Sequence, residues 1–115
     1  MTVGEIAREL NLTLLTKGDP DAPVLGGCCC DLLSWVMAHG VHQGAWITVQ
    51  THMNTIAVAA LLDLSCLIIP ESIPVEEDVL NKAEEEGIAV LQSPMTAYEI
   101  CGRLYRLGIG ASART

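Results

Sequence analysis

Residues 45–69, AWITVQTHMNTIAVAALLDLSCLII, decide how we interpret the fold of this chain. The stretch opens with a β-branched and aromatic run at 46–49, which favours a β-strand. A polar break follows at 50–54, then an apolar segment at 56–62, then a second short apolar run at 66–69. Strand, polar loop, helix and strand make a βαβ unit, which joins parallel strands by a right-handed crossover. The stretch therefore predicts a small α/β domain.

The rest of the chain alternates between helix and strand signals. Thr2 and Glu5 have the spacing of a capping box, and apolar residues recur at helical spacing, so we expect a first helix that ends near Asn11. Asp31 suits the N-cap of a helix over 32–39, which Gly40 ends. The pattern also predicts strands at 12–16, 24–30 and 88–91, a helix at 75–86 that ends before Gly87, and a last helix that starts with a second capping box, Thr96 and Glu99, and runs to 107.

This alternation after residue 24 is typical of a mostly parallel β-sheet flanked by helices. At 115 residues the chain fits one domain, which we place at 1–110, with a loose C-terminal tail at 111–115. A domain of this size buries enough surface to fold without disulfides or a metal. We therefore predict the α/β class, with a single small domain built from βαβ units.

Charge and apolar patterning exclude two classes of partner. The formal net charge is −8, with 6 Lys and Arg residues against 14 Asp and Glu residues. No basic stripe is available for a phosphate backbone, so we exclude nucleic acid, and an anionic membrane surface is disfavoured. The segment 56–69 is too short to span a bilayer, and we see no secretion signal, so we expect a cytoplasmic protein without membrane contact.

The helix expected at 54–62 is apolar all round and therefore lacks a solvent face. Half of the residues in the chain are hydrophobic (50%), and the mean hydropathy is +0.40, which is high for a small monomer. Either the helix is sandwiched centrally, or its outer face meets another subunit. We expect a homodimer through this helix or its neighbours.

Polar side chains gather where the predicted strands lead into helices. In open parallel sheets, ligands bind outside the carboxyl ends of the strands, and helix N-termini there attract anions. The functional interpretation is a site for a small anionic ligand, such as a nucleotide or another phosphate-bearing molecule. In the alternative, Thr51 or Asn54 merely caps the helix, and His52 is a surface imidazole. The candidate ligand-binding residues are Asp31, Ser34, Gln50, Thr51, His52 and Asn54.

Cys28, Cys29 and Cys30 form a run on an expected strand, where alternate residues face opposite ways. Metal sites in small domains usually space their cysteines roughly two to four residues apart, and the chain contains no Cys-x-x-Cys, so we assign no metal ligand. Cysteines of a cytoplasmic protein are expected to be reduced and to pack as small buried hydrophobes. We interpret His39 and His42, which flank a glycine turn, as exposed residues.

No catalytic constellation is recognisable in the sequence. A phosphate-cradling P-loop and a Gly-x-Ser-x-Gly nucleophile elbow are both absent, and no acid/base pair can be assigned. We therefore expect no enzymatic activity and no cofactor.

Residues 24–37, VLGGCCCDLLSWVM, and 46–52, WITVQTH, resemble the DRTGG domain family, and the likeness covers residues 2–109. DRTGG domains are small α/β modules in the regulatory inserts of some phosphotransacetylases and of CBS-containing pyrophosphatases. A similar fold forms the N-terminal domain of HPr kinase/phosphorylase. The resemblance implies a parallel-sheet core, homodimers and a sensing or scaffolding role, because catalysis in those proteins lies in other domains. Similar stand-alone members are genome neighbours of iron-only hydrogenase and NADH-oxidising subunits, which implies a redox-metabolism setting.

The chain departs from the family at the residues of the family name. The Asp-Arg pair falls at Thr51-His52 and the Thr-Gly-Gly at Pro70-Glu71-Ser72, so the arginine best suited to phosphate is replaced. The leading hypothesis is a non-enzymatic regulatory or interaction module. It would be a homodimeric small-molecule sensor or scaffold in redox or energy metabolism, with a protein partner there. The alternative is a metal- or redox-handling accessory protein that uses Cys28, Cys29 and Cys30.

Overall fold

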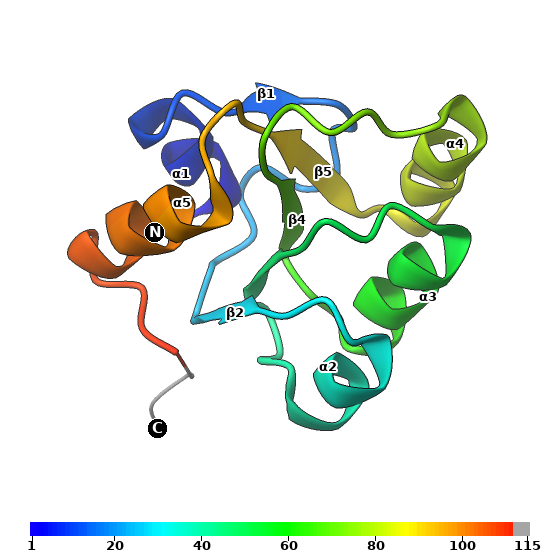
Figure 1. Cartoon of the computed structure of the whole chain (residues 1–115), viewed down its shortest axis with the longest axis horizontal. Coiled ribbons are helices and arrows are strands. Elements are labelled where there is room, and N and C mark those ends of the chain that lie inside the picture. Colours follow the sequence, from blue (N-terminus) through cyan, green and yellow to red (C-terminus); the bar gives the residue numbers. More distant parts are fainter. Residues whose placement is uncertain (112–115) are drawn as a thin grey trace.

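A computed structural model describes residues 1–111 as one β-sheet between two layers of helices (Figure 1). No helix in this range is long and apolar enough to cross a membrane. Most of the expected tail, residues 112–115, lies outside the described residues. The elements in chain order are α1 (Val3–Glu9), β1 (Thr13–Leu14), β2 (Gly27–Cys29), α2 (Leu33–His39), β3 (Ala45–Ile47), α3 (Met53–Leu61), β4 (Cys66–Ile69), α4 (Glu77–Glu86), β5 (Ala89–Gln92) and α5 (Ala97–Arg106).

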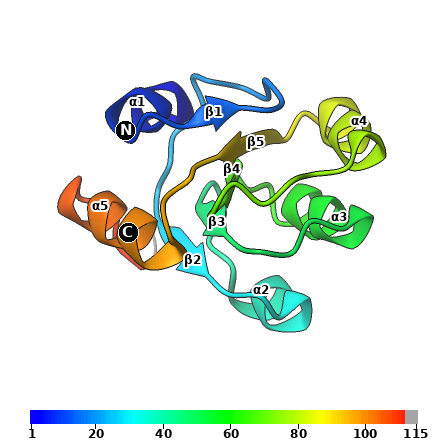
Figure 2. The same ribbon diagram turned by 45° about the horizontal axis from the view of Figure 1, so that its top comes forward.

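The sheet has five strands in the order β1–β5–β4–β3–β2. Strands β2 to β5 are parallel to their neighbours, and only β1 runs antiparallel, against β5. The predicted α/β class with a mostly parallel sheet is therefore confirmed. Helices α2, α3 and α4 cover one face of the sheet, and α1 and α5 cover the other (Figure 2). This arrangement follows from right-handed crossovers that all step in the same direction along the sheet.

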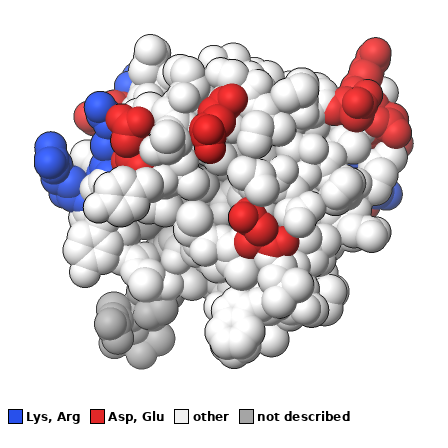
Figure 3. Space-filling view, viewed as in Figure 1, with Lys and Arg blue, Asp and Glu red and all other residues white. Residues whose placement is uncertain are grey.

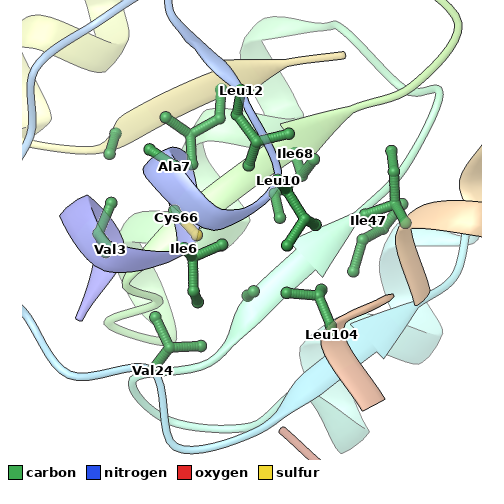
Figure 4. Close-up of a cluster of buried hydrophobic side chains, with 14 of the residues drawn as sticks. Val3, Ile6, Ala7, Leu10, Leu12, Val24, Ile47, Cys66, Ile68 and Leu104 are labelled. Carbon is green, nitrogen blue, oxygen red and sulfur yellow. The ribbon is translucent and has the colours of Figure 1, made fainter. Parts of the chain in front are cut away.

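Alternation along the strands builds a hydrophobic core on each face. Trp46, Leu67 and Val90 are aligned across β3, β4 and β5 and pack beneath α2, α3 and α4. Ile47 and Ile68, one residue further along their strands, join the core beneath α1 and α5, which Figure 4 shows. Because both faces are covered, the middle strands are apolar at nearly every position, as in other parallel sheets.

Local signals explain most of the helix ends. Thr2 Oγ1 accepts a hydrogen bond from Glu5 N at 3.2 Å, and Glu5 Oε1 accepts one from Thr2 N at 2.9 Å, which confirms the first capping box. Gly87 ends α4 with φ of 70°, a left-handed conformation that suits glycine. At α5, Thr96 Oγ1 accepts from Glu99 N at 3.2 Å, but Glu99 accepts no bond from Thr96 N among the described residues, so only half of the predicted second capping box forms.

Two predicted strands are much shorter in the structure. The expected strand 24–30 pairs only over Gly27–Cys29, because Val24 N donates to Met1 O and Leu25 N to Gln43 O, outside the sheet. The expected strand 12–16 is reduced to Thr13–Leu14, because Leu15 N and Thr16 N converge on one acceptor, Val90 O, and so break the regular ladder. Both short strands lie at the edges of the sheet, where each pairs with one strand.

Candidate functional site

The loops that follow the parallel strands lie along one edge of the sheet. Asp31 follows β2, residues 48–52 follow β3, residues 70–76 follow β4, and residues 93–96 follow β5. Neighbouring parallel strands are also consecutive in sequence, so the helices that join them all lie on the same face. Doubly wound sheets open a ligand crevice where the strand order reverses. No such reversal occurs between β2 and β5, and this edge is a row of loops.

Asp31 joins the loop after β2 to the loop after β3. Its Oδ1 accepts hydrogen bonds from Thr48 Oγ1 at 2.8 Å and from Val49 N at 3.0 Å, and its carbonyl oxygen accepts one from Gln50 Nε2 at 3.0 Å. Thr48 Oγ1 in turn accepts from Gln50 N at 3.1 Å. The structure thus brings Asp31 and Gln50, two of the six candidate residues, into one polar network.

The prediction that Asp31 caps α2 is wrong. Helix α2 starts at Leu33 with Leu32 as the N-cap, and no described side chain bonds to the free N–H groups of its first turn. The carboxylate of Asp31 instead accepts hydrogen bonds from Thr48 Oγ1 and Val49 N, which lie just after the neighbouring strand β3.

Gln50, Thr51 and His52 border a small hollow at the N-terminal end of α3. His52 is the N-cap of this helix, but among residues 1–111 no side chain caps its first turn. Thr55, on the first turn, also lines the hollow; it is 1% exposed, and its Oγ1 has no hydrogen-bond partner among the described residues. The hollow has a volume of about 10 Å³, on the order of one water molecule. The first turn of α3 therefore lacks a side-chain cap, and Thr55 on that turn carries a buried hydroxyl without a partner among the described residues.

Ser34 and Asn54, the other two candidate residues, lie elsewhere. Both line a groove between α2 and α3 with a volume of about 520 Å³. Neither helix contains a Lys, Arg, Asp or Glu, and the surface over α2, at the bottom of Figure 3, shows no charged side chain. We call this region the α2–α3 groove; its other lining residues are Leu33, Met37, Ala38, Ala57, Val58 and Leu61.

The remaining polar residues of the edge have local structural partners. Ser72 N donates to Ser93 O at 2.9 Å, and Glu71 N donates to Met95 O at 2.8 Å. Ser93 Oγ accepts from Met95 N, and Thr96 caps α5. These contacts hold the loops after β4 and β5 together.

The three consecutive cysteines face two ways, as expected for a strand. Cys28 and Cys30 pack against the core beneath α2, α3 and α4, and burial raises the pKa of the Cys28 thiol. Cys66 is fully buried, and desolvation raises the pKa of its thiol to about 12. Cys29 is exposed, so the expectation of buried cysteines is wrong for this residue. Cys29 lies on an edge strand, and within residues 1–111 no other strand pairs with β2 on its outer side.

The two turn histidines are exposed, as predicted, and each has a neighbour. The His39 ring stacks on Trp35 with centroids 4.0 Å apart, and His42 Nε2 lies 3.8 Å from Asp63 Oδ2. Within residues 1–111, no group of three or more His, Cys, Asp or Glu side chains is placed to hold a metal ion.

Sequence reasoning missed Thr48 and Thr55. From the sequence, Thr48 is predicted to be part of a β-strand, and Thr55 is predicted to lie in the first turn of an apolar helix. The available signal was their polarity: Thr48 is a lone hydroxyl in the run 46–49, and Thr55 immediately precedes the apolar segment 56–62, where burial is expected and buried hydroxyls need partners.

No protein-family model matches the chain, and no curated protein matches it. Among solved structures, the chain is similar to the CBS and DRTGG domains of the regulatory region of Clostridium perfringens pyrophosphatase, in complex with its activator, diadenosine tetraphosphate. The TM-score is 0.73 and the sequence identity 12%, and the match covers 90% of this chain and 45% of the other. This chain therefore spans less than half the length of that neighbour.

At this level of identity, the likeness shows the fold alone. The chain has a small α/β fold similar to that of the CBS and DRTGG domains of this neighbour, which agrees with the fold implied by the sequence resemblance. The neighbour is a regulatory region rather than a catalytic one, and the activator is bound to that larger protein.

Proposed function

We propose that this chain is a regulatory module that binds a small anionic ligand at the N-terminal end of α3 and works as a homodimer. The fold likeness to a regulatory region that binds a nucleotide activator supports a regulatory, ligand-binding role. The six candidate residues remain the proposed ligand-facing set, now with two parts. Gln50, Thr51 and His52 border the hollow, with Asp31 positioning their loop, while Ser34 and Asn54 extend toward the α2–α3 groove.

The observation that carries the ligand proposal is the hydroxyl of Thr55. A buried hydroxyl without a partner costs roughly 1–3 kcal/mol, and native proteins seldom leave one unpaired. Here Thr55, which carries the unpaired hydroxyl, is one of the residues that line a hollow at a helix end without a side-chain cap among the described residues. Helix N-termini of this kind favour anions through free N–H groups and the helix dipole. A ligand oxygen at the mouth of the hollow would satisfy both sets of donors.

The residues around the hollow select a ligand that is held by neutral donors. No Lys or Arg occurs between Lys17 and Lys82. A carboxylate or a single phosphate group would therefore be bound through N–H and O–H groups, without an ion pair. We expect the affinity for this ligand to vary little with salt concentration, because no charged side chain contacts it and there is no ion pair for salt to screen.

The experiment is a thermal-shift titration with inorganic phosphate, AMP, ATP, acetyl phosphate and NADH. A ligand present at one hundred times its dissociation constant adds about 2.7 kcal/mol to the free energy of unfolding, which is several degrees for a domain of this size. We expect Thr55→Val and His52→Ala to remove the shift. Thr13→Val, at an exposed position on β1, is the matched control and should keep it.

Two results would overturn the ligand proposal. One is the absence of any shift with all five compounds. The other is a shift that survives unchanged in Thr55→Val and His52→Ala, because the ligand would then bind away from the hollow.

The α2–α3 groove supports the proposed homodimer. Large apolar side chains around it are exposed, including Leu61 at 70% and Met37 at 47%. A second copy of a chain with net charge −8 is repelled over most of its surface, but α2 and α3 contain no charged residue. Contact through these helices therefore buries apolar surface with the least charge repulsion.

The dimer is tested by sedimentation equilibrium on the wild type and Leu61→Glu. We expect a dimer for the wild type and a monomer for the variant, because a buried glutamate without a partner disfavours association. Leu25→Glu replaces another exposed leucine, outside the groove, and should remain dimeric. A monomeric wild type at micromolar concentration contradicts this part of the proposal.

We further propose that the module is a cytoplasmic, non-catalytic member of the DRTGG family with a protein partner in redox or energy metabolism. The support is the sequence resemblance over residues 2–109, together with a fold that is similar to a CBS/DRTGG regulatory region. Co-purification of a defined redox enzyme with the wild type, and its loss with Leu61→Glu or Thr55→Val, would identify the partner and the surface used.

The second candidate function is metal or redox handling by Cys28, Cys29 and Cys30. It is favoured by access: all three thiols are free, Cys29 is exposed, and its two neighbours are half-buried. Metal analysis and thiol titration of anaerobically purified protein test it. Protein without iron or zinc whose folded-state thiols do not react would rule this candidate out.

A further inference from the structure

A second cavity lies on the opposite face of the sheet from the α2–α3 groove, where α5 packs against β2 and β3. Its volume is about 200 Å³. Apolar side chains make most of its wall, and three cysteines are among the lining residues. The lining residues that matter here are Cys29, Ile47, Cys101, Leu104 and Ile109.

Two thiols from distant parts of the sequence meet at this cavity. The side chains of Cys28 and Cys30 pack beneath α2, α3 and α4, so the alternation of a strand directs Cys29, which lies between them, to the α5 face. Cys28 and Cys29 are both among the residues that line the cavity. Cys101 lies on the face of α5 that packs against the sheet, next to the buried Ile100 and Leu104. Desolvation raises the pKa of the Cys29 thiol, and Cys101 adds to the rise through its charge and a side-chain hydrogen bond, so that the pKa reaches about 12. Both cysteines therefore line the same cavity, one from β2 and one from α5.

We propose that Cys29 and Cys101 form a reversible disulfide that links the edge strand β2 to α5. The proposal goes beyond the ligand site at α3, which is on the other face of the sheet. It also differs from a role for Cys28, Cys29 and Cys30 as one unit, because these residues are divided between the two faces.

The reaction is thiol–disulfide exchange with a low-molecular-weight disulfide such as glutathione disulfide. One protein thiol loses its proton, and its sulfur attacks the reagent, so that a mixed disulfide forms and one glutathione thiolate leaves. The second protein sulfur then displaces the other glutathione. In total, two protein thiols are oxidised to one disulfide, and one glutathione disulfide is reduced to two glutathione thiols, so electrons and protons balance.

The raised pKa of Cys29 fixes the character of this exchange. At neutral pH the thiol stays protonated, so exchange is slow and accelerates as the pH rises. At that sulfur the reduced form gains no stabilisation from a thiolate, and disulfides of this kind resist reduction more than those of low-pKa thiols. The proposed disulfide therefore forms under sustained oxidation and is reduced slowly.

The disulfide would restrict the movement of strand β2, which leads into the polar network around Asp31. Strand β2 has only three residues and pairs on one side, with β3. It continues into Cys30, whose carbonyl oxygen accepts from Trp46 Nε1 at 2.8 Å, and then into Asp31. A covalent link from Cys29 to α5 restricts this segment from the opposite face.

The test uses the full chain, equilibrated anaerobically with glutathione and glutathione disulfide at about pH 8, where exchange is faster. Of the 5 thiols, we expect three to remain titratable. Trypsin cuts after Lys17, Lys82 and Arg103, so the peptide 18–82 should be joined to the peptide 83–103 before reduction and separate from it afterwards. We expect Cys29→Ser and Cys101→Ser to lose the joined pair, and Cys28→Ser and Cys30→Ser to keep it.

Three outcomes would overturn the proposal. They are five titratable thiols in the oxidised wild type, a joined peptide pair that persists in Cys29→Ser, and a link between two copies of the chain instead of within one. Phenylarsine oxide supplies a second measurement that needs no oxidation, because it bridges two neighbouring thiols and releases water. The wild type should bind one phenylarsenic group through both thiols, and Cys29→Ser should not.

Discussion

The unpaired hydroxyl of Thr55 predicts an unusual gain in stability on mutation. Thr48 and Thr55 are both 1% exposed, but their hydroxyls differ in bonding. Thr48 Oγ1 donates to Asp31 and accepts from Gln50, whereas Thr55 Oγ1 has no partner among the described residues. Threonine to valine replaces the hydroxyl by a methyl group of similar size at each site. We therefore expect opposite effects from Thr55→Val and Thr48→Val.

The magnitudes follow from the bonds made and lost. Removing a buried unsatisfied hydroxyl relieves roughly 1–3 kcal/mol, and we take about 1 kcal/mol for Thr55→Val, because the hollow admits a water molecule. Thr48→Val loses two hydrogen bonds, one of them to a carboxylate, and leaves Asp31 with fewer donors, which costs about 2 kcal/mol. The two variants should therefore differ by about 3 kcal/mol, or more than 10 °C in Tm.

Urea unfolding followed by tryptophan fluorescence measures both variants. Trp46 is fully buried beneath α2, α3 and α4, and its environment changes on unfolding. The slope of the free energy against urea should match the wild type in each variant, so that midpoints compare directly. A Thr55→Val protein that is less stable than the wild type would refute the reasoning, since its hydroxyl would then have a partner.

Three further predictions concern glycine conformation and a buried thiol. Gly18→Ala should cost about 3 kcal/mol, because its φ is +53° and an added Cβ would lie 2.4 Å from Ala89 N, whereas Gly87→Ala, with φ of +70° and open space, should cost about 1 kcal/mol. Equal losses in chemical denaturation would contradict this. The pKa of Cys66 is raised from 9.0 to about 12 in the folded protein, so the unfolded state loses its proton first as the pH rises. Its contribution to stability is complete below about pH 9 and is lost between pH 9 and 12; Cys66→Ala should flatten this decline in denaturation curves, and an unchanged pH profile would argue against it.

The elements with unbroken local signals could be predicted from the sequence. The apolar run Cys66–Ile69 is a strand with the predicted bounds, and α3 is displaced by one residue from the prediction, at Met53–Leu61. The capping box of Thr2 and Glu5 also forms as expected. In each case, the residues that decide the structure are close together in the sequence.

Predictions were wrong where a distant partner decides the structure. Asp31 has the local features of an N-cap, but its carboxylate accepts hydrogen bonds from Thr48 and Val49, in the loop that follows β3. Val24 and Leu25 have strand composition, but their N–H groups bond to atoms outside the sheet, Met1 O and Gln43 O. Predictions based on residues that are close together in the sequence cannot tell whether a local hydrogen bond or one to a distant partner will form.

The sequence predicted which edge of the sheet carries the candidate site, but not the shape of the surface there. Parallel strands bring the loops with Asp31 and Gln50 together, as the pattern implied. The strand order decides whether a crevice opens there, and it is a property of the whole chain. It places Ser34 and Asn54 in a groove between helices, and it leaves Cys29 on an edge strand, where it lines the same cavity as Cys101.

The strand order also bears on how the protein is made. From β2 onward, each strand is added beside the one synthesised just before it, so the sheet can grow on the ribosome with short loop closures. Strand β1 is synthesised first but pairs with β5, and Thr16 bonds across to Ile88 and Val90. The earliest segment must therefore wait for nearly the whole chain. In pulse-labelled hydrogen exchange, we expect amides of β3 and β4 to be protected before those of residues 13–16, and the reverse order would exclude this route.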